Sequence, residues 1–254
     1  MRKAMQEHLK KAGTPREHIR VLALGDCNTR TIDPKQGTAA DGLMEALQSR
    51  GFETSLVNIS GGMASSREGL AQICHFDVAA DLAIINYGLV DSWITTIPQF
   101  YVPYFPDSPA RRRARKFLKF VKRRLRHNIL RRLVPTGPVV PETEFEQNVR
   151  SMVSVLRRRN PATAVFLWAT LPVDDNAPRN FQLARYNGLL NRVADTEQAV
   201  FIDTEKALAD QPRQKRFIDG VHLSPDSASR LGAHILNVYL ASRAQTATIR
   251  SKAA

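Results

Sequence analysis

Three side chains in this sequence have the types and the spacing of a nucleophilic catalytic set. Cys27 stands in the segment Gly25-Asp26-Cys27, directly after an apolar run, and His222 follows much later with Asp219 three positions before it. A cysteine thiolate attacks acyl carbons, an imidazole takes up and returns the proton, and a carboxylate orients the imidazole. We therefore interpret these residues as a Cys-His-Asp triad.

Each of these residues has a simpler interpretation when it is taken alone. Most free cysteines are small buried hydrophobic residues, and a histidine just before a helix is commonly a surface or capping group. The pairing of Cys27 with the Asp219–His222 segment favours chemistry instead. We expect Cys27 to lie in a sharp strand-to-helix turn beside the amides of the following helix, where the pKa of its thiol would be lowered.

Short, nearly continuous apolar runs alternate with helical patterns along the chain. The expected strands are 20–24, 54–58, 82–87, 164–169 and 199–203. The expected helices are about 38–51, 64–75, 143–159, 179–196 and 225–243. Apolar runs of this kind are typical of parallel strands that are covered on both faces. In the last helix, Ser224 is the expected N-cap and Pro225 the first helical residue.

This alternation predicts an α/β protein: a doubly wound, three-layer α/β/α domain around a central parallel sheet of about five strands. In such sheets the functional site lies at the carboxyl ends of the strands. Cys27, the Gly61–Gly62 pair and the segment from Gly88 to Asp91 all directly follow expected strands. We expect these segments to meet at one edge of the sheet.

One segment interrupts the alternation. An aromatic and proline-rich loop is followed by a basic helix, expected over 108–134, and we interpret 97–142 as an insertion in a single domain that covers 1–254. Between Arg111 and Arg132 the chain has twelve Lys or Arg and no Asp or Glu, which accounts for nearly all of the net charge of +13.

The basic helix has an amphipathic pattern, in which apolar side chains recur about four residues apart. These are Phe117, Val121, Leu125, Ile129 and Leu133, joined by Leu118, Phe120 and Leu130. Three uses stay open: a lid docked on the domain, a helix lying on an anionic membrane, or a contact for a polyanion such as a charged polysaccharide or nucleic acid. No zinc spacing, stacking-aromatic motif or helix-turn-helix pattern accompanies the helix, so no specific nucleic-acid motif is expected.

Taken in order, these segments resemble the four blocks of the SGNH (GDSL-type) hydrolases, which are Gly-Asp-Ser, an oxyanion glycine, Gly-x-Asn-Asp and Asp-x-x-His. The matching segments are Leu24-Gly-Asp-Cys27, Ile59-Ser-Gly-Gly62, Tyr87-Gly-Leu-Val-Asp91 and Ile218-Asp-Gly-Val-His-Leu223. The resemblance spans about 18–100 and 145–243. The last block is the specific one, because this ending before a Pro-Asp helix start is usual in the family. The resemblance implies the SGNH fold, which is flavodoxin-like, and chemistry on O-acyl groups.

The resemblance also implies a role for each block. Cys27 is the nucleophile, His222 the base and Asp219 the group that orients the base. The N–H groups of Cys27 and of a block-two glycine receive the oxyanion, and we favour Gly62 over Gly61. The resemblance also implies that Gly88, Asp91 and Asp26 lie on the oxyanion or substrate-binding side of the site.

Two positions depart from the family's pattern. Cys27 stands where the family has serine, and Val90, which has no donor, stands where the third block has asparagine. Losing one oxyanion donor typically costs about 10²–10³ in rate. Asn28 and Asn86 are near in sequence and are candidates to replace that donor. The intact acid–base pair favours activity, whereas Val90 favours an inactive protein.

We therefore expect an SGNH-like hydrolase or acyltransferase that acts on an O-acyl ester. By analogy with the family, the ester is expected to be that of a carbohydrate. The alternative is a catalytically inactive protein of this fold that binds a membrane surface or an anionic polymer through its basic helix. A flavodoxin-like cofactor protein ranks third, because no Gly-rich phosphate loop follows the first strand. No cofactor or metal is expected, since Cys74 and His75 are adjacent but have no further metal ligands nearby in sequence.

Composition suggests the cellular setting. A chain of 254 residues with 43% hydrophobic content can bury the core of one large domain. No apolar segment follows the basic N-terminus, so a secretory signal is not expected, and no run approaches the roughly 18 apolar residues of a membrane span. Two cysteines give no disulfide framework. These features predict a cytoplasmic protein. The basic helix would also allow it to bind peripherally to a membrane.

Overall fold

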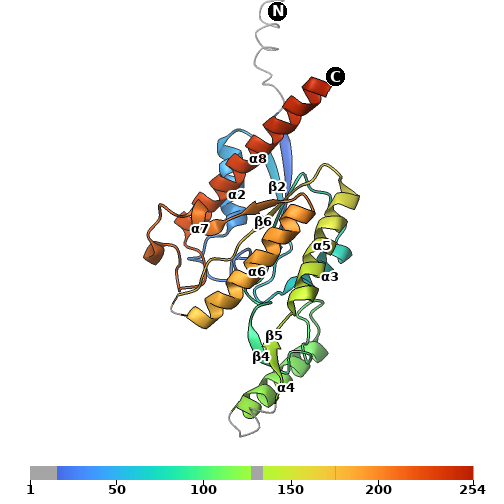
Figure 1. Cartoon of the computed structure of the whole chain (residues 1–254), viewed down its shortest axis with the longest axis vertical. Helices are drawn as coiled ribbons and strands as arrows, with labels where there is room; N and C mark the ends of the chain where they lie inside the picture. Colours follow the sequence, from blue (N-terminus) through green and yellow to red (C-terminus); the bar gives the residue numbers. More distant parts are fainter. Residues whose placement is uncertain (1–15, 127–133, 175, 254) are drawn as a thin grey trace, which may run out of the picture.

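In a computed structural model the chain forms a parallel sheet with helices on both faces (Figure 1), and the structure describes residues 16–126, 134–174 and 176–253. The strands of the sheet are β1 (His18–Gly25), β2 (Glu53–Asn58), β3 (Leu82–Asn86), β6 (Ala164–Trp168) and β7 (Val200–Ile202). They lie in the order β2-β1-β3-β6-β7, and every neighbouring pair is parallel. The expected fold class is confirmed.

Helices cover the sheet in two layers (Figure 1). One layer consists of α2 (Ala39–Ser49) and α8 (Pro225–Ala253), and the other of α3 (Ser66–His75), α5 (Glu142–Arg159) and α6 (Ala177–Thr196). The short α7 (Thr204–Ala207) and a 3-10 turn (Arg213–Lys215) connect β7 to α8. Ser224 precedes α8 as expected, and its hydroxyl accepts a hydrogen bond from the N–H of Ser227 at 3.3 Å.

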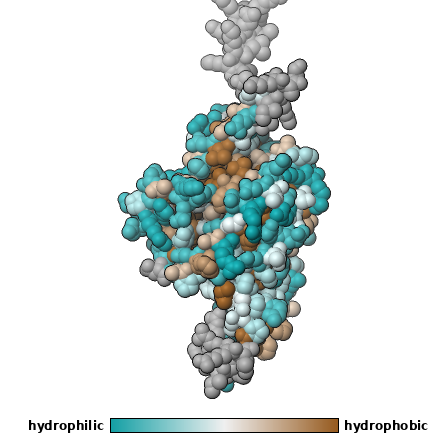
Figure 2. All heavy atoms as spheres, in the orientation of Figure 1, coloured by the Kyte–Doolittle hydropathy of each residue, from teal (hydrophilic) through white to brown (hydrophobic). Residues whose placement is uncertain are grey.

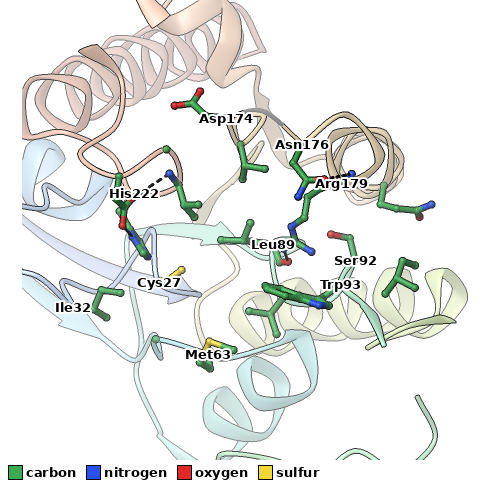
Figure 3. A pocket seen from close by; sticks show the side chains of 18 of the residues that line it. Cys27, Ile32, Met63, Leu89, Ser92, Trp93, Asp174, Asn176, Arg179 and His222 are labelled. Carbon is green, nitrogen blue, oxygen red and sulfur yellow. Dashed lines mark hydrogen bonds and ion pairs between the residues drawn. The ribbon is translucent and has the colours of Figure 1, made fainter. Parts of the chain in front are cut away.

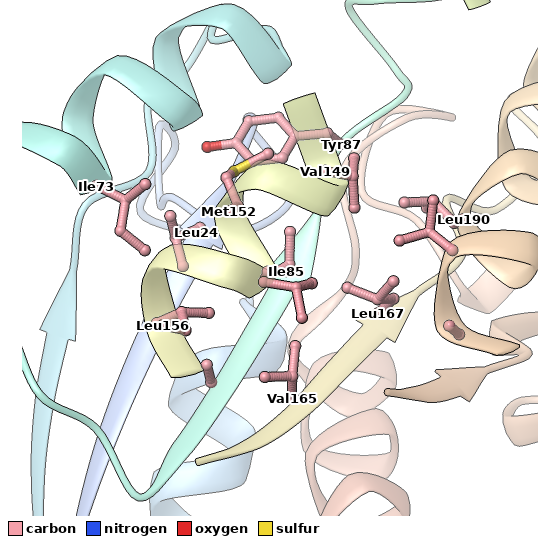
Figure 4. Packing of buried hydrophobic residues seen from close by; sticks show 14 of the residues in the cluster. Leu24, Ile73, Ile85, Tyr87, Val149, Met152, Leu156, Val165, Leu167 and Leu190 are labelled. Atoms are coloured by element: carbon pink, nitrogen blue, oxygen red, sulfur yellow. The ribbon is translucent and has the colours of Figure 1, made fainter. Parts of the chain in front are cut away.

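Each central strand contributes to two hydrophobic cores, because successive side chains of a strand point to opposite faces. Leu24, Ile85 and Leu167 pack with Met152 and Leu156 of α5 on one face (Figure 4). The neighbouring strand residues pack toward α2 and α8 on the other face, and they include Ala23, Ile84 and Phe166. This double burial explains why the strands are apolar at nearly every position.

β2 is the exception to that pattern. We expected all strands to be covered on both faces, but the side chains of β2 are exposed or half-buried. The strand lies at an edge of the sheet, beside β1 only. An edge strand extends past the covering helices, so its apolar residues are partly open to solvent.

α2 and α8 touch through their backbones at one point. A Cβ atom on Gly232 would lie 2.2 Å from the carbonyl carbon of Gly42 and 2.2 Å from the nitrogen of Leu43. No side chain fits into such a gap, so glycine is required there. The two helices can therefore approach closely, and each of them adjoins a loop of the site described below.

The segment after β3 has more structure than the sequence indicated. β4 (Ile94–Thr96) and β5 (Thr136–Pro138) form an antiparallel pair, and α4 (Pro109–Arg126) lies beyond them at the lower end of Figure 1. We expected an irregular loop before the helix, because strands of three residues show no readable alternation. Residues 127–133 of the expected basic helix, with Ile129, Leu130 and Leu133, lie outside the described residues.

The apolar stripe of α4 is divided between two faces. Ala114, Leu118 and Val121 are half-buried and face the rest of the chain, whereas Phe117 is 65% and Phe120 is 54% exposed. The expected single stripe is therefore wrong for the two phenylalanines. Helical geometry places Phe117 about 60° and Phe120 about 120° from the centre of the docked face.

The outer surface is largely polar. Hydrophilic side chains cover most of the face shown in Figure 2, with apolar atoms visible between them. Of the helices that the structure describes, none is both long and apolar enough to cross a membrane.

Candidate active site

A cavity of about 630 Å³ opens at the carboxyl ends of the strands (Figure 3). Cys27 reaches it from the turn after β1, Val90 from the loop after β3 and Val173 from the loop after β6. Asp219 and His222 reach it from the loop before α8. The structure thus brings the three residues of the expected triad to one cavity, at the expected edge of the sheet.

Cys27 is held in a tight turn. The N–H groups of Thr29 and Arg30 donate to the carbonyl oxygen of Asp26, at 3.1 and 3.2 Å. Gly25 is required for space, because a Cβ atom there would lie 2.1 Å from Oγ1 of Thr29. The helix expected at about 38–51 is α2, and a loop lies between it and the turn of Cys27.

The environment of the Cys27 thiol is the opposite of the one we expected. Only 6% of the residue is exposed, and it packs with Leu89, Val173 and Leu183. Burial raises the pKa of the thiol well above its ordinary value, and the charge of Asp26 raises it further. The expected lowering is therefore absent, and the resting group is a neutral thiol.

Asp219 and His222 form a well-defined pair. Nδ1 of His222 lies 2.6 Å from Oδ2 of Asp219. The N–H groups of His222 and Val221 donate to Oδ1 of the same carboxylate, at 2.8 and 3.1 Å. Desolvation acts to raise the pKa of Asp219, but these hydrogen bonds hold it below its ordinary value. The carboxylate therefore fixes both the ring and the backbone of the histidine.

His222 and Cys27 lie at the same end of the cavity (Figure 3). Between these two described side chains there is no direct hydrogen bond. Contacts of this kind are often long without substrate and tighten when the substrate binds. The arrangement thus places a thiol and a carboxylate-oriented imidazole at one end of the cavity.

Asp26 and Asp91 do not line the cavity, although we grouped them with the substrate side. Both are fully buried. Asp26 accepts a hydrogen bond from the N–H of Asn28 at 3.0 Å, and burial raises the pKa of its carboxyl group to about 7. Asp91 accepts from the N–H groups of Ser66 and Gly88, at 2.8 and 3.2 Å, so it fastens the loop after β3 to the start of α3. Burial raises the pKa of Asp91 to about 6.

The three glycines of the site have different positions. Gly62 lines the cavity, and within the described residues its N–H makes no hydrogen bond. The N–H of Gly61 instead donates to the carbonyl of Gly25 at 3.0 Å, which ties the turn after β2 to the end of β1. Gly88 has a φ of +128°, which favours glycine, and it does not line the cavity. Gly62 is thus the glycine with an available donor.

Neither expected replacement for the donor missing at Val90 faces the cavity. The side-chain amide of Asn86 is buried and donates to the carbonyl of Trp168 at 2.9 Å and to Oγ1 of Thr170 at 3.1 Å. Asn28 is also buried and does not line the cavity. Asn86 therefore links the ends of β3 and β6, and neither asparagine offers a donor to the cavity.

Arg179 and Trp93 are part of the site, and no motif in the sequence indicated them. The guanidinium of Arg179 lies 4.4 Å from the centre of the Trp93 ring, and it donates to the carbonyl of Leu89. Both side chains line the cavity (Figure 3). Burial lowers the pKa of Arg179, while the charges of Asp26 and Cys27 act to raise it. A cation therefore lies on the side of the cavity opposite His222.

No group of three His, Cys, Asp or Glu side chains among the described residues is placed to hold a metal ion. Cys74 is an exposed free thiol. The ring of the adjacent His75 packs edge-on against Phe76, with 5.2 Å between the ring centres. The two cysteines therefore differ in environment: Cys74 is exposed, whereas Cys27 is buried.

The sequence from residue 23 to residue 228 matches the model of the GDSL-like lipase/acylhydrolase family. No curated protein matches the chain. An acetylxylan esterase from Geobacillus stearothermophilus has a similar structure, with a TM-score of 0.57 and 17% identity over 87% of this chain and 94% of that one. TesA gives a TM-score of 0.54 and 17% identity over 86% and 96% of the two chains.

An α/β hydrolase enzyme from the metagenome of Lake Arreo, Spain, is also similar, with a TM-score of 0.56 and 18% identity over 85% and 93% of the two chains. At such identities the likeness shows a shared fold. Three solved variants of the acetylxylan esterase are described as catalytic mutants, with alanine in place of a serine, a histidine and an aspartate. In that enzyme the aspartate precedes the histidine by three positions.

Proposed function

The chain belongs to the GDSL-like lipase/acylhydrolase family, and from that premise we propose that it hydrolyses or transfers the acyl group of an O-acyl ester through Cys27, His222 and Asp219. One observation carries the proposal: a buried thiol and a histidine hydrogen-bonded to a carboxylate line the same cavity at the carboxyl ends of the strands. The Asp-x-x-His spacing equals that of the two catalytic positions in the acetylxylan esterase.

In the first half of the reaction the sulfur of Cys27 attacks the ester carbonyl. Nε2 of His222 takes the thiol proton, and Asp219 stabilises the imidazolium that forms. The tetrahedral intermediate then collapses, the bond to the alcohol oxygen breaks, and the imidazolium gives its proton to that oxygen. The alcohol leaves, and the acyl group stays on the sulfur as a thioester.

In the second half, water or an acceptor alcohol attacks the thioester. His222 takes the proton of the attacking oxygen and returns it to the sulfur as the thioester bond breaks. With water the product is a carboxylic acid, and with an alcohol it is a new ester. Both outcomes use the same residues, so the acceptor decides between hydrolase and acyltransferase.

The developing oxyanion needs donors. In this proposal the N–H groups of Cys27 and Gly62 supply them, and the free N–H of Gly62 supports that assignment. Val90 offers none, and we propose that the cation of Arg179 compensates in part by its charge. The raised pKa of the Cys27 thiol means that His222 must act as a general base in the attacking step.

The substrate side follows from the same family. The described likeness to an acetylxylan esterase makes an O-acetyl ester of a carbohydrate the first substrate to test. The cavity of about 630 Å³ is within the usual range of small-molecule sites. Its apolar wall, formed by Leu89, Val90 and Val173, suits an acyl chain.

The test measures hydrolysis of 4-nitrophenyl acetate and of acetylated xylooligosaccharide. Cys27→Ala and His222→Ala are expected to lose turnover, and Cys74→Ala, which removes the exposed cysteine, is the matched control. Mass spectrometry of the acid-quenched wild-type protein is expected to find the acyl group on Cys27. No turnover of either ester and no acylation of Cys27 would overturn the proposal.

A second candidate is a catalytically inactive protein of the same fold that binds an anionic surface through its basic helix. The exposed Phe117 and Phe120 among the cations of α4 favour it, because such a face suits the boundary of an anionic membrane. In this reading 97–142 is an insertion in a single domain, and the protein is peripheral at a cytoplasmic membrane surface.

Binding to anionic vesicles separates the two candidates. The second predicts salt-sensitive co-sedimentation that Phe117→Ser/Phe120→Ser reduces and Cys27→Ala leaves unchanged. Equal co-sedimentation of the double variant and the wild type would exclude membrane docking through this face.

A further inference from the structure

A second cavity, of about 700 Å³, adjoins the candidate active site. Met63, Val90 and Trp93 line both cavities, so the two cavities adjoin at these side chains. Met63 and Trp93 are visible on the same side of the first cavity in Figure 3. The second cavity is therefore the neighbouring space for any part of a ligand that the first cavity does not hold.

One wall of the second cavity is cationic. Among the described residues its lining contains no Asp or Glu, and all of its Lys and Arg residues come from α4. They are Arg112, Arg115, Lys116, Lys119, Lys122 and Arg123. A helix rises 1.5 Å per residue, so the wall from Arg112 to Arg123 is about 16 Å long. It can contact several negative charges of one ligand.

Part of this wall is fixed by acidic and aromatic partners. Asp107 pairs with Arg112 and with Arg115, each at 2.8 Å. Arg115 also lies 4.4 Å from the centre of the Tyr104 ring. Lys116 and Lys119, in contrast, form no ion pair with any acidic side chain that the structure describes. Their charge is available to a ligand.

The cavity also has an aromatic surface that is held in place. Phe100, Tyr101 and Tyr104 line the cavity. Buried Glu68 holds this loop, because its Oε1 accepts hydrogen bonds from the hydroxyl of Tyr101 and, at 2.8 Å, from the N–H of Tyr104. The cavity thus combines flat apolar surface with fixed positive charge, which suits a polar, negatively charged chain better than an acyl tail.

We infer that the second cavity is a subsite for the alcohol part of the substrate, and that the substrate is an O-acyl ester carried on a molecule with several carboxylate or phosphate groups. The acyl group occupies the first cavity, and the anionic part lies along α4. The statement that the ligand is an O-acyl ester rests on the proposed function. The statement that the second cavity binds an anionic molecule rests on that cavity alone.

The first test compares two substrates with the same acyl group. Acetylated oligogalacturonate is anionic and acetylated xylooligosaccharide is neutral. The wild-type kcat/KM is expected to be roughly tenfold higher for the anionic ester, the size of effect that two or three solvent-screened ion pairs give together. Raising the salt concentration should remove this preference.

Two double variants of α4 form a matched pair. Lys116→Glu/Lys119→Glu changes the cavity wall, and Arg113→Glu/Arg124→Glu makes the same change of net charge at exposed positions that do not line the cavity. The first pair should raise the KM for the anionic ester roughly tenfold and leave turnover of the neutral ester within twofold. The second pair should retain the wild-type preference. Equal losses in both pairs, or no preference in the wild type, would overturn the inference.

Inhibition distinguishes the two kinds of anion. Hexagalacturonate and inorganic tripolyphosphate are compared as competitors of the anionic ester: stronger inhibition by the first assigns carboxylates to the subsite, and by the second phosphates. Inhibition by neither is a result against the subsite. If Lys116→Glu/Lys119→Glu weakens only binding to anionic vesicles, α4 contacts a membrane and the subsite is wrong.

A binding experiment separates this inference from the proposed catalysis. Cys27→Ala protein is titrated with unacetylated hexagalacturonate and with tripolyphosphate, with and without the Lys116→Glu/Lys119→Glu change. Binding of either that depends on these lysines supports the subsite even if no ester is turned over. Turnover without such binding supports the catalysis and overturns the subsite.

Discussion

Replacing Asp26 by asparagine would separate the charge of this buried side chain from its shape. The acceptor oxygen for the N–H of Asn28 stays, and the other oxygen, which has no hydrogen-bond partner among the described residues, becomes an amide nitrogen. The wild-type carboxyl group has a pKa of about 7 in the fold, against 3.8 in an unfolded chain. The fold therefore binds the proton more tightly than the unfolded chain does.

The sign and the size of the effect follow from this difference. A raised acid pKa means that stability is greatest below the unfolded value and decreases as pH rises from about 4 to about 7. The shift from 3.8 to about 7 corresponds to up to about 4 kcal/mol above pH 7, of which about 2–3 kcal/mol is lost between pH 5 and pH 8. Asparagine cannot ionise, so the stability gain of Asp26→Asn over the wild type should grow by that amount across this range.

Thermal unfolding at pH 5 and pH 8 measures the effect. For a chain of this size the expected change in the Tm difference is about 5–10 °C. Glu205→Gln makes the same charge change at an exposed position and serves as the control. Because the charge of Asp26 also raises the pKa of the Cys27 thiol, Asp26→Asn should speed alkylation of Cys27 at pH 8. Parallel Tm values for wild type and variant from pH 5 to pH 8 would refute the reasoning.

Two further predictions concern the candidate catalytic set. Asp219→Asn keeps the acceptor for the backbone N–H groups but offers an N–H to Nδ1 of His222, so the ring proton moves to Nε2 and the base is lost. Ester kcat/KM should fall by about 10²–10⁴ with an unchanged Tm; a loss of less than tenfold would contradict the assigned tautomer. Arg179→Met removes the cation that lowers the pKa of the Cys27 thiol, so the pH profile of Cys27 alkylation should move to higher pH. An unmoved profile would show that Arg179 does not act on the sulfur.

The sheet and the positions of Cys27, Asp219 and His222 could be predicted from the sequence, because both depend on local patterns. Strands that are covered on two faces are apolar at nearly every residue. Loops after parallel strands meet at one edge. A three-residue spacing also lets an imidazole fold back on a carboxylate, as the 2.6 Å contact between His222 and Asp219 confirms.

The rest of the site depends on packing that no local pattern encodes. The pKa of the Cys27 thiol is set by how deeply Leu89 and Leu183 cover it, and a turn motif does not reveal that depth. Arg179 reaches the cavity because the start of α6 lies against the loop after β3, and this contact carries no motif. Asp91 and Asp26 match family blocks in sequence, yet burial turns both inward, away from the cavity.

The contact of Gly42 with Gly232 has a consequence for when the site can exist. α2 follows the loop of Cys27, and α8 follows the loop of His222, so the close packing of α8 on α2 helps to hold the two loops at the same cavity. During synthesis the thiol leaves the ribosome long before the histidine does. A nascent chain that ends before residue 222 carries Cys27 without His222, and one shortened within α8 keeps His222 but loses part of the helix that follows it. If the proposed acyl chemistry is correct, it requires α8 to be docked on α2, and substitutions at either glycine should slow the appearance of activity during refolding without changing a reacting group.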